Sequence, residues 1–378
     1  MSYRVVVSIL DRNSAFATRL SELQQLAAQA LGEAPALRFA SAIYDPPSDL
    51  LHTFADNSRG ASKLTHYSAK LGDVPSLAFA HRPNAERVVG DLRQFEGSRH
   101  VHTRQLLDMG YRASYARAVH YGKRLIGIIF VNSTTPEYFG PSRLAAIDPF
   151  VRLAALHLTL ELSYYQTFSA AITSAQAISA YRDTDTAEHL TRMSHYSAII
   201  ADGIAAKYRL GDDFVAKLFQ FAPMHDIGKV SVPDAILLKP GKLTPDEFDA
   251  MKSHVATGLA MVDKIIESVG LGDLPGIDIL RNTVRYHHEK LDGTGYPYGL
   301  TAQDIPIEAQ ILAVADIFDA LTSHRPYKEA WPVERAFEEL RRQASVKLNA
   351  DCVEALATRL PEVVKVMETF GDRPSMSA

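Results

Sequence analysis

The second half of the chain carries histidine and aspartate residues in segments whose other residues predict burial. Asp316 lies in the apolar stretch ILAVADIFDALTS, and the pair His225-Asp226 follows FVAKLFQFAPM. A buried carboxylate is costly unless it is paired or bound to a metal. The other members of this set are Asp185, His189, His254, His287 and His288. A fold that buries them together must bring distant segments of the chain to one place, and this requirement constrains the fold more than any other feature.

Each of these residues has an ordinary explanation when it is taken singly. A lone histidine in a helix is usually a core or surface residue, and we assign His157, His195 and His324 to that class. Asp319, one turn after Asp316, is expected to cap a helix or pair instead. The metal hypothesis depends on the joint occurrence of the set.

The ligand types narrow the choice of metal. The chain has one cysteine, Cys352, so a cysteine-based zinc or iron–sulfur site is excluded. Imidazole and carboxylate ligands suit Fe or Mn, with Ni and Zn as alternatives. Two or three divalent ions would use this many ligands, and closely spaced ions stabilise an in-line displacement at phosphorus. Lys229 could then offset phosphate charge or assist the leaving oxygen, and its ordinary explanation is a surface cation at a helix end.

Composition bounds the class of protein. The chain has 378 residues, a formal net charge of -4 and a pI near 6.4, which argues against a partner that is a nucleic acid polymer. No apolar run reaches the ~18 residues of a membrane helix, and the apolar start is too short for a signal peptide. We therefore expect a cytoplasmic protein without a membrane partner.

The first half mixes strand and helix patterns. YRVVVSIL predicts a strand, residues 14–31 a helix, residues 37–44 and 50–54 strands, and residues 113–133 a hairpin around Tyr121-Gly122-Lys123. A long helix is expected from Ser142 to about Tyr181, with a kink or restart at Pro149. It is either a connecting core helix or a dimerising, signal-transmitting one. In the helical second half, Thr244-Pro245-Asp246-Glu247 predicts a capped helix start.

Three motifs together resemble the HD-GYP family, a branch of the HD metal-dependent phosphohydrolase superfamily. They are HDIGK at residues 225–229, HHEKLDGTGYPYGL from His287, and IPIEAQILAVADIFDALTSHRPYKEA. The resemblance runs from about Ala177 to Leu360, and ILLKPGKLTPDEF before His254 belongs to it. It implies an all-helical cyclic di-GMP phosphodiesterase that yields pGpG, with further cleavage to GMP left open.

The resemblance also implies roles for individual residues. The metal ligands would be His189, His225, Asp226, His254, His287, His288 and Asp316, with Asp226 bridging two ions and Asp185 standing where three-metal members have glutamate. Lys229 would lie near the scissile phosphate, and Asp226 and Lys229 are the catalytic candidates. Gly295, Tyr296 and Pro297 would shape the pocket mouth, and Arg325 and Lys328 would contact substrate phosphates or bases.

The first half resembles a GAF-like sensory domain through YARAVHYGKRLIGIIFVNSTTPEYFGPSRLAAIDPF, with a PAS-like or other mixed sheet fold as the alternative. We expect an α+β domain at residues 1–150, with an antiparallel sheet and flanking helices, that binds an unknown small ligand. A connecting and dimerising helix would span residues 151–182, an all-α HD-type helical bundle residues 183–370, and a frayed tail residues 371–378.

The leading hypothesis is a homodimeric phosphodiesterase that the N-terminal domain regulates. The alternative is a weakly active or non-catalytic adaptor that binds a cyclic dinucleotide and uses the DGTGYP loop for partners such as diguanylate cyclase domains. A hydrolase of another cyclic dinucleotide is a further alternative.

Overall fold

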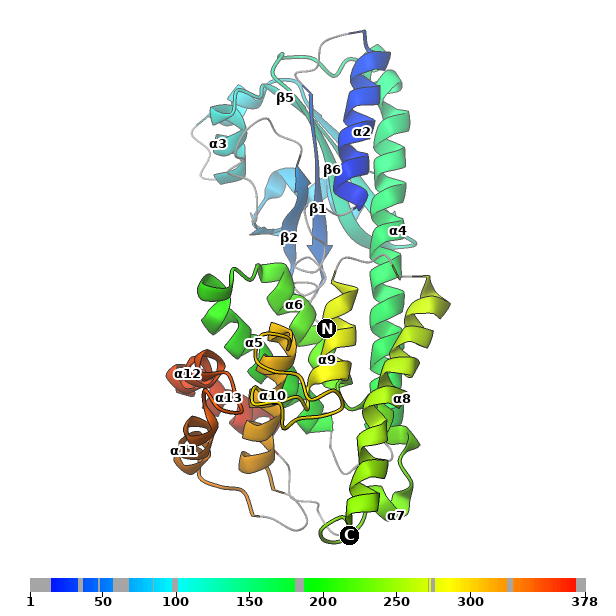
Figure 1. The fold of residues 1–378 in the computed structure, drawn as a ribbon. Helices are drawn as coiled ribbons and strands as arrows, with labels where there is room; N and C mark the ends of the chain where they lie inside the picture. Colours follow the sequence, from blue (N-terminus) through cyan, green and yellow to red (C-terminus); the bar gives the residue numbers. More distant parts are fainter. Residues whose placement is uncertain are drawn as a thin grey trace, which may run out of the picture. The chain divides into compact units, whose positions relative to one another are not determined.

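The structure is a computed structural model, shown in Figure 1, that describes residues 15–32, 37–46, 48–56, 68–83, 85–96, 101–180, 187–270, 272, 276–324 and 329–371. The chain divides into two compact units, Met1–Tyr165 and Gln166–Ala378. The predicted strand YRVVVSIL lies outside the described residues. Among the described residues, no helix combines the length and the hydrophobicity that a membrane span requires.

The first unit contains a six-stranded antiparallel sheet in the order β3-β2-β1-β6-β5-β4. Its strands are β1 (Leu37–Asp45), β2 (Leu50–Asp56), β3 (Ser68–Lys70), β4 (Glu86–Val89), β5 (Ala113–Tyr121) and β6 (Arg124–Ser133). The helical segments are α2 (Ala15–Ala30), η1 (Pro75–His81), η2 (Leu92–Phe95), α3 (Val101–Asp108) and the first part of α4 (Pro141–Ala180). This antiparallel sheet with flanking helices is the architecture predicted for a GAF-like domain.

Both faces of the central strands are covered. Helices α2 and α4 lie side by side against the sheet (Figure 1), and Gly127 of β6 lies close to the Leu158 side chain of α4. Residues Leu125 to Ser133 of β6 are therefore buried without alternation. The predicted hairpin is confirmed, since β5 and β6 meet at a turn in which Gly122 has φ +61°.

The sequence predicted a kink or a restart at Pro149, and helix α4 runs through this residue without a restart. A proline inside a helix removes one backbone hydrogen bond. Here Ile147, Val151 and Ala154, which flank Pro149, are fully buried. Their packing holds the helix together across the missing bond.

The second unit is a helical bundle. Its main helices are α5 (Ala187–Tyr208), α6 (Asp212–Phe221), α8 (Pro245–Val269), α9 (Ile277–Tyr286), α10 (Ile307–Thr322), α11 (Val333–Gln343), α12 (Ala350–Thr358) and α13 (Leu360–Phe370). Short turns η3 (Ala222–Met224), η4 (Ile227–Ser231) and α7 (Asp234–Leu237) connect α6 to α8. One core forms around α5 and α10, where Tyr196 meets Phe318 edge-on at 5.2 Å.

Two local signals set element boundaries in this unit, and the second of them was predicted. Pro223 follows the end of α6 and starts the short turn η3. Thr244 and Glu247 form a complete capping box at the start of α8. Together these two boundaries place His225-Asp226 on a turn and His254 on the third turn of a helix.

Candidate metal centre

Seven of the predicted ligands lie together in two adjacent groups. One group contains Asp226, His254, His287 and His288, and the other contains His189, His225 and Asp316. Within each group, the candidate donor atoms lie within 4.8 Å of one another. Asp316 is half-buried rather than fully buried, while the rings of His189, His225, His254 and His287 are buried. The eighth predicted ligand, Asp185, lies outside the described residues.

Five segments supply these side chains. His189 comes from the first turn of α5, and His225-Asp226 from the turns between α6 and α8. His254 is on α8, Asp316 is on α10, and His287-His288 follow α9 directly. The side-by-side histidines are explained by the end of α9, because both rings can then face one centre.

Asp226 joins the two groups. Its Oδ1 lies 3.2 Å from Nε2 of His254 and 3.3 Å from Nε2 of His287. Its Oδ2 lies 3.2 Å from Nε2 of His225, which belongs to the other group, and 2.9 Å from Nζ of Lys229. One carboxylate oxygen therefore faces each group, which is the arrangement that a bridging carboxylate needs.

Three of the histidine rings are held through Nδ1, the ring nitrogen that points away from the cluster. Nδ1 of His225 donates to the carbonyl of Ala222 at 2.8 Å, and Nδ1 of His254 to the carbonyl of Met251 at 2.7 Å. Nδ1 of His287 faces the carbonyls of Thr283 and Val284, each at 3.0 Å. Because a carbonyl only accepts, each Nδ1 carries a hydrogen, and Nε2 is the nitrogen that points inward.

The inward atoms fit bound metal ions. In the part of the chain that the structure describes, Nε2 of His225, His254 and His287 and Oδ1 of Asp226 are buried without a hydrogen-bond partner. Buried polar atoms rarely lack a partner, and a metal ion would provide one. Histidine ligands usually donate their other nitrogen to an anchoring acceptor, as these do.

Asp226 is the anionic centre of the cluster. Burial would raise the pKa of its carboxyl group, but the charges of Lys229 and His225 hold that pKa well below its usual range. Burial would lower the pKa of His225, but the Asp226 carboxylate raises it to about 9. Burial lowers the pKa of His287, and burial together with His287 lowers that of His288. The last two rings are therefore neutral, the form that binds metal.

His189 is anchored by a side chain rather than by the backbone. Its Nδ1 lies 2.7 Å from Oδ2 of Asp319, whose Oδ1 accepts from Nε of Arg192 at 2.6 Å. Asp319 was expected to cap or pair, and it pairs. Arg192 was not identified from the sequence, although its position three residues after His189 on one helix was an available signal.

Two glycines allow the turn η4 to approach helix α8. A Cβ on Gly228 would lie 1.9 Å from the carbonyl oxygen of His254 and 2.5 Å from the backbone nitrogen of Gly258. This close approach sets Asp226 beside His254. The sequence does not reveal the role of either glycine, because that role depends on a contact between distant segments.

The loop after α9 lies beside His288. The Tyr296 ring packs on the His288 ring at 4.5 Å, and Phe248 of α8 meets Tyr296 edge-on at 6.0 Å. A Cβ on Gly295 would lie 2.4 Å from the backbone nitrogen of Lys290, so this position requires glycine. Pro297 follows Tyr296 through a cis peptide bond.

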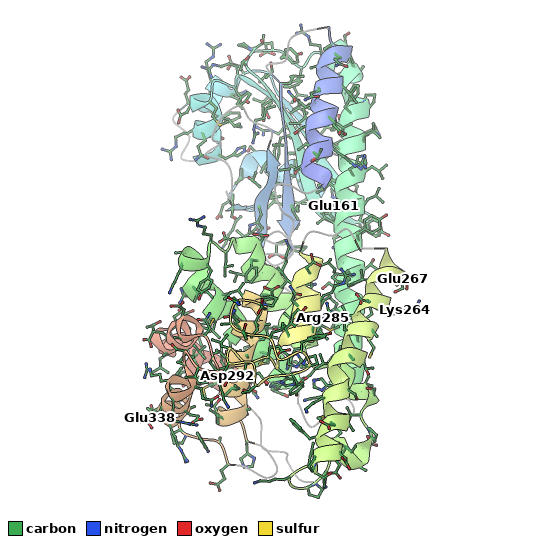
Figure 2. All side chains as sticks on the ribbon, viewed as in Figure 1. Glu161, Lys264, Glu267, Arg285, Asp292 and Glu338 are labelled. Atoms are coloured by element: carbon green, nitrogen blue, oxygen red, sulfur yellow. The ribbon has the colours of Figure 1, made fainter. Side chains whose placement is uncertain are left out.

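The shape of this loop has two internal supports. The buried carboxylate of Glu289, a residue that the sequence analysis missed, accepts from the backbone nitrogens of Tyr298 at 2.7 Å and Leu300 at 3.0 Å. Asp292, labelled in Figure 2, accepts from the Thr294 backbone nitrogen at 3.0 Å. Two other predicted substrate contacts, Arg325 and Lys328, lie outside the described residues.

Comparison with known proteins agrees with this geometry. Residues 184–351 match the family model described as HD domain. The chain is 39% identical over 200 residues to the cyclic di-GMP phosphodiesterase response regulator RpfG of Xanthomonas campestris, covering 52% of this chain and 50% of that protein. It is 39% identical over 189 residues to a cyclic di-GMP phosphodiesterase of Thermotoga maritima, covering 50% of this chain and 48% of that protein.

A 3'3'-cGAMP-specific phosphodiesterase of Vibrio cholerae is 34% identical over 198 residues, covering 52% of this chain and 36% of that protein. The chain thus spans about half the length, or less, of these curated relatives. A solved GAF domain/HD domain protein from Geobacter sulfurreducens aligns at a TM-score of 0.32 and 17% identity, over 39% of this chain and 94% of that one. Residues 184–351 of the present chain thus match the HD domain model and carry the HDIGK and HHEKLDGTGYPYGL motifs on which the resemblance to the HD-GYP family rests.

Proposed function

We propose that the chain is a metal-dependent phosphodiesterase that hydrolyses cyclic di-GMP to linear pGpG. The observation that carries this proposal is the inward-facing set of imidazole nitrogens around the Asp226 carboxylate. The names of the relatives from Xanthomonas and Thermotoga support cyclic di-GMP as the substrate. Further cleavage of pGpG to GMP is left to experiment.

The two groups of ligands suit two divalent ions, with Fe or Mn as the first choice and Ni or Zn as alternatives. Asp226 would bridge them, because its two oxygens face different groups. Such ions supply an activated water at neutral pH and positive charge for the phosphoryl oxygens. A third ion would depend on Asp185.

The chain's own residues position the substrate. Nζ of Lys229 lies at the edge of the cluster, 2.9 Å from Asp226 and with a side chain 17% exposed, so it can reach a phosphate oxygen. The Tyr296 ring, already packed on His288, offers a face for a guanine base. Gly295 and Pro297 hold that ring in place, and Arg325 and Lys328 would contact the phosphates or bases.

A second candidate substrate is a mixed cyclic dinucleotide. The similarity to a 3'3'-cGAMP-specific phosphodiesterase, 34% identical over 198 residues, favours it. The adaptor alternative is less favoured, because a protein that only binds partners through the DGTGYP loop has no need of seven converging ligands.

We infer that the first unit is regulatory and that the chain forms a homodimer through α4. Four large apolar residues at near-heptad spacing are exposed on this helix: Leu153, Leu156, Leu160 and Tyr164. A stripe of this kind is typical of a helix that pairs with a second copy. The domain limits proposed from the sequence, a cytoplasmic location and an interaction with diguanylate cyclase domains belong to the same proposal.

The test is product analysis on metal-loaded protein. The chain is purified without chelator, loaded anaerobically with Fe(II) or Mn(II), and given cyclic di-GMP, pGpG or a mixed cyclic dinucleotide. We expect pGpG from the wild type and none from a His225→Ala/Asp226→Ala double variant with an unchanged circular dichroism spectrum. His195→Ala is the matched control, since His195 stacks on Phe370 outside the cluster.

Two outcomes would count against the proposal. A metal-replete wild type that binds cyclic di-GMP without cleaving it would favour the adaptor. A folded double variant with full activity would exclude the cluster as the catalytic site.

A further inference from the structure

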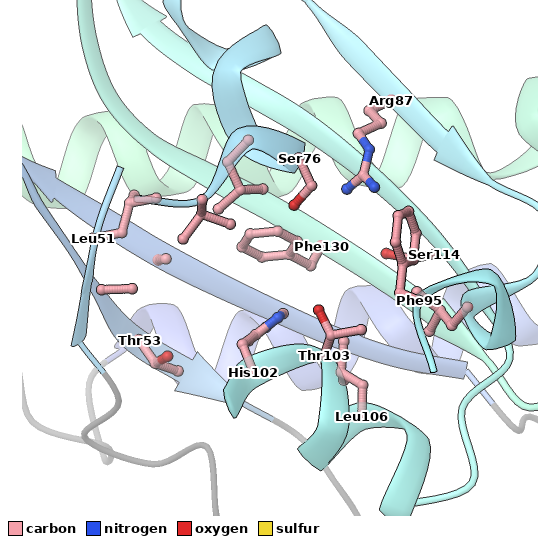
Figure 3. A pocket seen from close by; sticks show the side chains of 15 residues that line it. Leu51, Thr53, Ser76, Arg87, Phe95, His102, Thr103, Leu106, Ser114 and Phe130 are labelled. Carbon is pink, nitrogen blue, oxygen red and sulfur yellow. The ribbon is translucent and has the colours of Figure 1, made fainter. Parts of the chain in front are cut away.

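The first unit encloses a cavity of about 250 Å³ between the sheet and helix α3. Figure 3 shows the Phe130 ring at its centre. Its walls are mostly apolar and include Ala42, Leu51, Leu77, Leu92 and Leu106. At ~30 Å³ for each water molecule, the cavity has room for about eight of them. A compact organic molecule therefore fits this space.

One charged side chain interrupts the apolar wall. Figure 3 shows Arg87 of β4 with its guanidinium group directed into the cavity. Within the described part of the chain, no carboxylate contacts this group, and its Cζ lies 5.7 Å from the centre of the Phe95 ring. Burial lowers the pKa of Arg87, and no neighbouring charge acts in the opposite direction.

A second arginine on the neighbouring strand shows what is missing at Arg87. Arg117 of β5 is more deeply buried, and its Nη1 lies 2.6 Å from Glu86 and 2.6 Å from Asp148. The fold thus provides two carboxylates for one arginine and none for the other among the described residues. A desolvated guanidinium without an anion is unfavourable, so an anion that enters the cavity would be stabilised there.

The other polar side chains of the cavity are the imidazole of His102 and four hydroxyl groups, Thr53 among them. Ser76 and Thr103 line it, as does Ser114, whose hydroxyl accepts a hydrogen bond from Asn132 at 2.9 Å. The hydroxyls can donate to a bound oxygen, and Arg87 is the one permanently charged side chain among the described residues that line the cavity. One guanidinium matches one carboxylate, and its planar fork suits that group.

We propose that this cavity binds a compact organic acid, with an apolar or aromatic body against Phe130 and Leu106 and one carboxylate on Arg87. This inference concerns the first unit alone. It does not depend on the chemistry of the metal centre.

The test uses the full chain and two pairs of probes: benzoate with benzamide, and hexanoate with hexanamide. Isothermal titration and the shift in melting temperature report binding. We expect at least one acid to bind saturably and to raise the melting temperature, while its amide binds roughly ten- to a hundredfold more weakly, because it loses the charge-assisted hydrogen bonds.

Three variants locate the site. Arg87→Met should weaken binding of the acid to the level of the amide, and Arg87→Lys should retain part of the preference for the acid. Ala69→Phe, which fills the cavity from β3, should abolish binding of both probes. Arg82→Met is the matched control, because Arg82 is exposed and does not line the cavity.

The proposal is overturned by any of three results. Neither acid binds at millimolar concentration, each acid and its amide bind equally, or Arg87→Met retains the wild-type affinity. The binding measurements do not use the activity of the metal centre. This test therefore remains valid even if the proposed phosphodiesterase function is wrong.

Discussion

Replacing Gly228 with alanine tests the close contact between η4 and α8 without removing any of the predicted metal ligands. The added Cβ would lie 1.9 Å from the carbonyl oxygen of His254 and 2.5 Å from the backbone nitrogen of Gly258. Both neighbours are backbone atoms, so no side chain can rotate away. Non-bonded carbon and oxygen atoms need more than about 3 Å between their centres. The two segments must therefore move apart by roughly 1 Å.

The magnitude follows from this displacement. Overpacking a rigid contact typically costs about 1–3 kcal/mol of unfolding free energy. The effect on the site is larger, because Asp226 and His254 are carried on the two segments that move apart, with Oδ1 and Nε2 now 3.2 Å from each other. A misplacement of about 1 Å in an active site can reduce the rate by ~100-fold.

The assay compares three glycine variants by thermal denaturation, metal content from elemental analysis, and turnover. Gly228→Ala should lose bound metal and nearly all turnover. Gly258→Ala should have an intermediate effect, since its Cβ would meet Val284 at 3.0 Å and the Gly228 nitrogen at 3.1 Å. Gly140→Ala is the control, because its Cβ would meet nothing within 4 Å. Wild-type metal content and turnover in Gly228→Ala would refute this reasoning.

Three further changes test other parts of the second unit. Asp319→Asn should cost about 3 kcal/mol in urea denaturation, since it removes the charge that pairs with Arg192 and leaves one acceptor oxygen where Arg192 and His189 use two, and a loss below ~1 kcal/mol would contradict a structural role. Lys229→Met should retain bound metal and lower kcat by roughly 100-fold or more, and an unchanged kcat would remove this lysine from the mechanism. Burial raises the pKa of Glu308, although the hydrogen bond from Asn282 opposes it. The folded pKa therefore exceeds the unfolded one, and the contribution of Glu308 to stability is lost as the pH rises through the folded value. The melting temperature of Glu308→Gln, relative to that of the wild type, should accordingly increase between about pH 4 and pH 7. A difference in melting temperature that does not change with pH would contradict the direction of the Glu308 pKa shift.

Elements with strong local signals could be predicted from the sequence. The capping box at Thr244 and the turn at Gly122 act within a few residues of themselves, and both form as expected. The convergence of the metal-binding groups could also be predicted, because histidines and carboxylates in apolar segments require a common explanation.

Features that depend on contacts between distant segments could not be predicted. Glu289 shapes the loop through the backbone of Tyr298 and Leu300, and no spacing in the sequence reveals that bond. Arg87 and Arg117 look alike in the sequence, and only the fold gives carboxylate partners to one of them. At Pro149 the helix continues without a restart, so tertiary packing there overrides a local signal that could have ended it.

The groups that accept hydrogen bonds from Nδ1 of the histidine rings determine how well the site tolerates substitutions around it. Three rings are oriented by main-chain carbonyls located three or four residues earlier, at Ala222, Met251 and Thr283-Val284. Point substitutions at those positions leave the carbonyl in place, so the orientation is inherited with the helical turn itself. His189 alone among these four relies on a replaceable partner, the side chain of Asp319, and one mutation suffices to release it.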